Sequence, residues 1–176
     1  MVEALLHFAV PFASLRAFGL DWRRTLFVSI LALAPDLDIL FHVHRSLSHS
    51  LVVLAVIVLP ILAIAHKHKA ITNLTLLATV GVIMHLALDI FGAYTPLLWP
   101  ISNQAIEIIT SLTLHMGSFP YFTLNLGLRT QPYMFGAFQS IDAPVITAEG
   151  LAISLVLLVP SLAPLIRNHA IVHRGK

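Results

Sequence analysis

The stretch Pro35-Asp36-Leu37-Asp38, followed by His42-Val43-His44-Arg45-Ser46-Leu47-Ser48-His49, places acids and histidines inside a strongly apolar chain. A second polar piece, His85-Leu86-Ala87-Leu88-Asp89, interrupts another apolar run. Only 10% of the 176 residues are charged, and ionisable side chains are costly in hydrocarbon. Their clustering therefore needs a compensating partner, and a bound metal ion accounts for most of them at once.

The composition indicates an integral membrane protein. The chain is 58% hydrophobic with a mean hydropathy of +0.91, whereas soluble domains are about 45–50% apolar and about 25% charged. We expect one integral membrane domain over residues 1–176. Cysteine is absent, so nitrogen and oxygen must hold any metal. Lys and Arg form no basic stripe, which argues against a nucleic-acid partner.

Five apolar runs have roughly the length of a membrane span, which takes about 20 residues. They cover residues 3–18, 25–41, 49–65, 70–92 and 150–166. We therefore predict an all-α membrane protein with about five transmembrane helices and a polar site at its extracytoplasmic end. Several runs are short, so the bilayer would have to thin around them or neighbours would have to cover them.

The segment 93–149 differs from these runs, because it is rich in Gly, Pro, Thr, Ser and Asn. Within it, residues 106–114 and 121–128 alternate roughly between apolar and polar side chains, as half-buried strands do. We expect an extracytoplasmic cap here, either a short β-hairpin or an irregular segment before the last helix.

Charge placement predicts the orientation. If all five runs cross, one side of the membrane receives eight of the ten Lys and Arg residues: Arg16, Arg23, Arg24, Lys67, Lys69, Arg167, Arg174 and Lys176. The other side receives only Arg45 and Arg129. The positive-inside rule makes the first side cytoplasmic, which predicts a multi-pass inner-membrane protein with its N-terminus outside and its C-terminus in the cytoplasm. The acids and histidines of the two polar stretches quoted above then lie at the outer face.

The spacing of the polar residues limits how they can meet. His85 and Asp89 are four apart and share one face of a helix. Gly81 and Gly92 fall near that face and would allow another helix or a substrate to approach closely. Asp36 and Asp38 would diverge on a helix, so the backbone must turn for both to reach one pocket. Ser46 or Ser48 is a plausible N-cap for the helix that follows.

The energetic cost of the carboxylates favours cations. One Asp at mid-membrane costs about 2.5–3.5 kcal/mol on insertion scales, and Arg45 is the only fixed cation near Asp36, Asp38 and Asp89. One or two divalent cations could neutralise all three, and zinc suits the histidines best, with manganese or iron as alternatives. Such a cage is used to hydrolyse phosphoesters. Asp36 or Asp38 would then act as general base, and Arg45 would bind the anionic phosphate.

The order of these motifs over residues 1–102 resembles the predicted membrane-bound metal-dependent hydrolases. This bacterial and archaeal family includes DNA-damage-regulated inner-membrane proteins and is distantly similar to zinc-dependent phospholipase C. Its usual His-Arg-Gly-x-Thr-His-Ser motif reads His44-Arg45-Ser46-Leu47-Ser48-His49-Ser50 here, so the Gly and the Thr are replaced. Residues 140–147, with Asp142, are more weakly similar to a segment before the family's last helix. The resemblance implies these metal ligands: His7, Asp36, Asp38, His44, His49, His85 and Asp89.

Three functions fit these features. The first is a metal-dependent hydrolase that acts on a phosphoester or lipid-like substrate from the bilayer. The second is a metal-ion or proton transporter, since intramembrane acids and histidines also mark ion paths. The third is a structural membrane protein with a metal clip, because closed and open cages use the same ligands. Residues 51–65 carry no polar side chain, which favours a one-sided site over a path.

Overall fold

The computed structural model describes residues 3–43, 45–134, 136–139 and 146–174, with side chains described up to Ala163. Five α-helices, two short 3-10 helices and one β-hairpin make up this described part. In chain order they are α1 (Ala4–Ala17), α2 (Trp22–Leu31), η1 (Ala34–Phe41), η2 (Leu47–His49), α3 (Leu51–Ala65), α4 (Lys69–Asp89), β1 (Gln104–His115), β2 (Tyr121–Pro132) and α5 (Ala148–Arg174).

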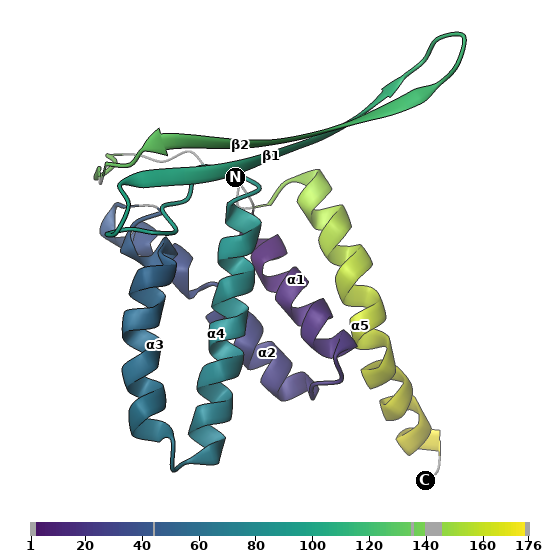
Figure 1. The fold of residues 1–176 in the computed structure, drawn as a ribbon. Helices are drawn as coiled ribbons and strands as arrows, with labels where there is room; N and C mark the ends of the chain where they lie inside the picture. Colours follow the sequence, from purple (N-terminus) through teal and green to yellow (C-terminus); the bar gives the residue numbers. More distant parts are fainter. Residues whose placement is uncertain (1–2, 44, 135, 140–145, 175–176) are drawn as a thin grey trace.

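The helices run alternately toward and away from the hairpin, which crosses one end of the bundle (Figure 1). α4 is central and packs against α1, α2 and α3, while α5 packs against α1. The two 3-10 helices lie at the hairpin end, and α5 carries the chain to the opposite end (Figure 1). Every loop that bears predicted ligands is therefore at the same end of the bundle.

The predicted second span, residues 25–41, is not one helix. Asp21 caps α2 by accepting hydrogen bonds from the backbone N–H groups of Arg23 and Arg24, each at 3.1 Å. α2 ends at Leu31, and η1 begins at Ala34 with Pro35 in its first turn. Proline has no N–H to continue an α-helical ladder but fits the first turn of a new helix. This break gives the backbone a turn at Asp36.

The start of α3 also differs from the prediction. The N-cap is Ser50, whose hydroxyl accepts from the N–H groups of Val52 and Val53 at 3.2 and 3.3 Å. Ser46 and Ser48, the predicted caps, donate instead to Asp38. A carboxylate eight to ten residues upstream is a stronger acceptor than any backbone group, and sequence spacing alone did not reveal it.

Gly81 allows α4 to approach α2 closely, as its position on the helix face predicted. A Cβ at this position would lie 2.9 Å from Cγ1 of Val28 and 3.1 Å from its carbonyl oxygen. A backbone atom at this distance cannot move aside as the end of a flexible side chain could. The contact fixes the position of α4 along its axis relative to α2. It therefore also fixes the level at which His85 and Asp89 lie beside η1.

The hairpin confirms the prediction for residues 106–114 and 121–128. β1 and β2 pair antiparallel, from Gln104 opposite Pro132 to His115 opposite Tyr121. The N–H of Ile108 donates to the carbonyl of Ile90 at 2.6 Å, so the base of the hairpin is tied to the end of α4. The far part extends past the helices (Figure 1).

Only α4, among the described helices, is long and apolar enough to count as a membrane span, with a mean hydropathy of 1.8 over its best window. α1, α3 and the described part of α5 are apolar but shorter. The five α-helices and the hairpin are thus confirmed. That all five helices cross a bilayer stays a prediction.

Candidate metal centre

Five of the predicted ligands come together at the hairpin end of the bundle, from four separate elements. His7 comes from α1, Asp36 from η1, His49 from η2, and His85 and Asp89 from α4. His7, His49, His85 and Asp89 are at most 1% exposed, whereas the side chain of Asp36 is 21% exposed. The cluster is therefore buried on the α4 side and reaches the surface at Asp36.

Four side-chain atoms converge on one point: Oδ1 of Asp36, Nε2 of His49, Nε2 of His85 and Oδ2 of Asp89. Each imidazole nitrogen lies 3.5 Å from the Asp36 oxygen. Their distances to the Asp89 oxygen are 3.2 Å from His49 and 3.3 Å from His85. The two nitrogens are 3.3 Å apart. All four atoms lie within 4.8 Å of one another, so this group could hold a metal ion.

These distances fit the ligand shell of a tetrahedral metal. Zinc binds nitrogen and oxygen at about 2.0–2.2 Å, so the edges of its tetrahedron measure about 3.4 Å. Two imidazoles and two carboxylates are also a donor set that zinc accepts. The buried Oδ2 of Asp89 accepts no well-aligned hydrogen bond from the described residues, although Nε2 of His49 and Nε2 of His85 lie 3.2 and 3.3 Å away. A cation at the centre would satisfy that oxygen.

His7 lies against the same two carboxylates from the other side. Its Nδ1 is 3.8 Å from Oδ2 of Asp36, and its Nε2 is 3.6 Å from Oδ1 of Asp89. The ring stacks on His85, with centroids 3.9 Å apart. In the described part of the chain neither His7 nitrogen has a hydrogen-bond partner. His7 thus faces the two carboxylate oxygens that do not belong to the four-atom group, Oδ2 of Asp36 and Oδ1 of Asp89.

Asp38, which we expected among the ligands, lies behind His49. Its Oδ2 accepts hydrogen bonds from the Ser46 N–H at 3.0 Å, the Ser46 hydroxyl at 3.1 Å and the Ser48 hydroxyl at 2.8 Å. The same oxygen is 3.3 Å from Nδ1 of His49. Asp38 therefore holds the outer nitrogen of the ring and leaves Nε2 facing the cluster, as carboxylates behind metal-binding histidines do.

Arg45 is not a free cation, contrary to the expectation of an anion-binding side chain. Its Nη2 donates to Oδ1 of Asp89 at 3.0 Å, and the residue is 8% exposed. Its backbone has a φ of 54°, and His42 has a φ of 56°. Such conformations are uncommon outside glycine and often accompany functional sites. They bend the loop so that Arg45 returns to the cluster.

Tyr133 supports this loop and was not predicted from the sequence. Its hydroxyl donates to the backbone carbonyl of Arg45. Burial, and after it the charge of Asp38, raise the pKa of Tyr133 above its usual value, so the hydroxyl stays protonated and able to donate. Tyr133 follows directly after β2, and only the paired hairpin brings it back over the loop. His44 and Asp142 lie outside the described residues.

A family model described as "YdjM inner membrane protein" matches residues 2–163. The chain belongs to the YdjM inner membrane protein family. This match confirms the resemblance drawn from the motifs and extends it from residues 1–102 to most of the chain. All the residues of the buried cluster lie inside the match with the YdjM family model. No curated protein and no solved structure matches the chain.

Proposed function

We propose that the protein is a membrane-embedded, metal-dependent hydrolase that acts on a phosphoester or lipid-like substrate at the outer membrane face. The observation that carries the proposal is the convergence of Asp36, His49, His85 and Asp89 on one buried point. It lies at the end of an apolar, 21-residue helix. Zinc is the cation that these donors suit best, and manganese or iron would also be accepted.

The chain's own residues have separable tasks in this proposal. His49 and His85 present Nε2 to the cation, and Asp38 fixes the His49 ring from behind. A bound divalent cation would polarise a phosphoryl oxygen and lower the pKa of a coordinated water. Asp36, whose side chain is the exposed one of the four, lies where substrate and water would enter. We assign the proton-accepting role to its Oδ2, which lies outside the four-atom group.

Arg45 would contribute positive charge next to this entrance. The guanidinium is held by Asp89 at 3.0 Å, and its Nε has no partner among the described residues. A phosphate oxygen arriving beside Asp89 would share this guanidinium, which recognises phosphate better than a lysine would because its donors are planar.

Membrane insertion is supported by α3. None of its fifteen residues is polar, and Val56, Ile57, Leu59 and Ile64 are each at least 55% exposed. A surface of this kind is stable against lipid and unstable in water. With the family name and the distribution of Lys and Arg, this favours an inner-membrane protein with its N-terminus and hairpin outside and its C-terminus in the cytoplasm.

The second candidate is a structural metal clip, and one observation favours it. Four protein side chains are enough to complete a tetrahedral shell, as in structural zinc sites, whereas catalytic zinc usually has three protein ligands. Transport has no comparable support, because α3 offers no polar side chain toward the cytoplasmic end.

Metal content and turnover together test the proposal. Purified protein should bind zinc and release 4-nitrophenolate from methyl 4-nitrophenyl phosphate, and His85→Ala should lose both properties. Zinc binding that stabilises the fold, without hydrolysis of this ester or of lipid phosphoesters, would contradict the enzyme and favour the clip. Absence of bound metal from the wild-type protein would contradict both.

A further inference from the structure

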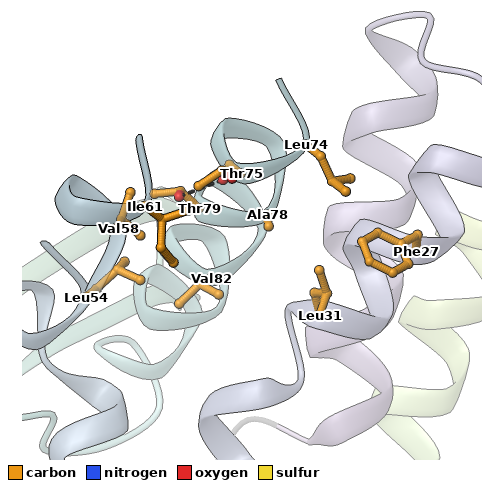
Figure 2. Close-up of a pocket in the computed structure, with 10 residues that line it drawn as sticks. All are labelled: Phe27, Leu31, Leu54, Val58, Ile61, Leu74, Thr75, Ala78, Thr79 and Val82. Atoms are coloured by element: carbon orange, nitrogen blue, oxygen red, sulfur yellow. Dashed lines mark hydrogen bonds between the residues drawn. The ribbon is translucent and has the colours of Figure 1, made fainter. Parts of the chain in front are cut away.

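An apolar groove lies on the side of the metal centre away from the hairpin, lined by residues of α2, α3 and α4 (Figure 2). Its volume is about 280 Å³, close to the lower limit of small-molecule pockets. Phe27 and Leu31 come from α2, and Leu54 and Val58 from α3. Phe27 is 45% exposed, so the groove opens sideways toward the region that lipid would occupy.

The groove begins where the metal centre ends. Each of the three elements that line it also leads into a ligand at the hairpin end: Leu31 precedes Asp36 by five residues, Leu54 follows His49 by five, and Val82 precedes His85 by three. On α4 the top of the groove is thus only about 4.5 Å along the axis from a ligand, at 1.5 Å per residue. Ala78, Val82, His85 and Asp89 follow one helix face at spacings of three and four.

The polar groups of the groove are turned away from it. Its lining contains two hydroxyls, those of Thr75 and Thr79. Thr75 donates to the carbonyl of Ile71 at 2.9 Å, and Thr79 donates to the carbonyl of Thr75 at 2.8 Å, as Figure 2 shows for the second pair. Both hydroxyls are therefore already bonded to carbonyls of their own helix. A polar ligand would find no partner there, whereas a hydrocarbon chain would be fully matched.

We propose that this groove binds the hydrocarbon tail of the substrate, which makes the substrate a phosphoester lipid rather than a small water-soluble phosphoester. This inference rests on the proposed function, because the metal centre has to receive the headgroup. The tail would run from Val82 past Ala78 to Leu74, about 12 Å along α4. The side opening lets the lipid enter from the outer leaflet without leaving the membrane.

Hydrolysis of 4-nitrophenyl phosphate esters with methyl, octyl and hexadecyl chains tests the inference on zinc-loaded protein in nanodiscs. We expect the wild type to prefer hexadecyl over methyl by at least about tenfold in kcat/KM, because a chain held in the groove positions its phosphate at the metal centre. Val82→Phe fills the top of the groove and should remove the preference for both long chains. Ala78→Phe fills it about 10 Å from His85, and should retain the octyl preference while losing the further gain from hexadecyl.

Val80→Phe is the matched control. Val80 lies on the same helix, is 44% exposed and does not line the groove, so chain-length preference should not change. A destabilised protein would lose activity toward all three esters equally, and would not shift the chain-length limit stepwise. If the two groove variants behave like Val80→Phe while the methyl ester is still hydrolysed, the tail site is wrong and the hydrolase stands.

A binding measurement separates the two proposals if no ester is hydrolysed, an outcome that would refute the hydrolase. Hexadecyl phosphate with a photoreactive diazirine at its terminal carbon should then label Phe27, Ile61 or Leu74 in the wild type. Ala78→Phe should abolish this labelling, and Val80→Phe should preserve it. Labelling spread evenly over the exposed helix faces would overturn the tail site. A change of oligomeric state in Ala78→Phe would also overturn it, by making the groove an interface between copies.

Discussion

The two halves of α4 differ in burial and in the polarity of their inward-facing side chains, although one continuous helix forms both. Its four fully buried residues, Gly81, His85, Leu86 and Asp89, all lie in the half near the hairpin. In that half, polar atoms from four elements point inward toward a common centre. In the other half, the α4 residues that line the groove between α2 and α3 are apolar except for Thr75 and Thr79, whose hydroxyls bond to their own helix.

This difference indicates that the two halves of α4 have different roles. Polar side chains are concentrated where they can satisfy one another or a cation, and the remaining surface is left compatible with hydrocarbon. A channel or transporter would need polar groups in both halves. The proposed reaction centre, with a lipid headgroup at one end and its tail at the other, would need this arrangement.

Removing one ligand should have the largest effect. His85→Ala takes away an imidazole nitrogen that lies within 3.5 Å of three other candidate ligand atoms. We expect bound zinc to fall from about one ion per chain to near zero, because a tetrahedral site rarely tolerates the loss of a protein ligand. Inductively coupled plasma mass spectrometry after dialysis measures this.

Thr79→Ala, in the other half of α4, is the control for that experiment and should keep its metal. Equal metal content in His85→Ala and wild type would show that the cluster is not the binding site.

Asp38→Asn should have an intermediate effect. The substitution weakens the support of His49 from behind without removing a residue of the four-atom group. Changes of this kind typically lower metal affinity by about 10–100-fold, so the site should still fill at saturating zinc. Competition titration against a zinc chelator gives the affinity. Loss of all metal at saturation would instead make Asp38 a direct ligand, as the sequence motif first suggested.

Gly81→Ala tests the close contact between α4 and α2, which lies near the middle of α4. The new Cβ would meet Val28 at 2.9 Å, and overpacking of this kind costs about 1–3 kcal/mol of unfolding free energy. Gly117→Ala, at the hairpin tip, meets no atom within 4 Å and should change stability little. Unfolding by SDS titration in mixed micelles compares them. Equal stability of the two variants would mean that the α2–α4 contact is looser than described.

The loss of one hydroxyl from the groove should have the smallest effect, and the loss of a hydroxyl beside the metal centre provides the contrast. Thr79→Val removes a hydroxyl that bonds only to its own helix, so the unfolding free energy should change by less than about 0.5 kcal/mol. Ser48→Ala removes a group that contacts both Asp38 at 2.8 Å and His49 at 3.0 Å, and should cost about 1–3 kcal/mol. If Thr79→Val were the more damaging change, the Thr79 hydroxyl would have a second polar partner in the groove besides the carbonyl of Thr75.

Regular spacing in the sequence predicted the regular parts of the molecule. The interval of four between His85 and Asp89 predicted a shared helix face, and the alternation in residues 106–114 predicted a strand. These features depend only on the period of helix and strand. The same reasoning failed at residues 25–41, where Pro35 divides the run into α2 and η1.

The loop between Asp38 and His49 could not be predicted in the same way. Its course depends on positive φ angles at His42 and Arg45 and on a hydrogen bond from Tyr133, which is distant in sequence. These contacts turn Arg45 toward Asp89 and place Asp38 behind His49. The sequence identified the residues that meet at the centre, but their separate roles follow from tertiary contacts.

Zinc-edge X-ray absorption on the purified, zinc-loaded protein tests the central claim most directly. We predict a four-coordinate shell of nitrogen and oxygen at about 2.0–2.1 Å with the outer-shell scattering of two imidazoles, and no bound-zinc spectrum from dialysed His85→Ala. A spectrum without imidazole scattering, or one that His85→Ala leaves unchanged, would contradict the assignment of the metal centre to Asp36, His49, His85 and Asp89.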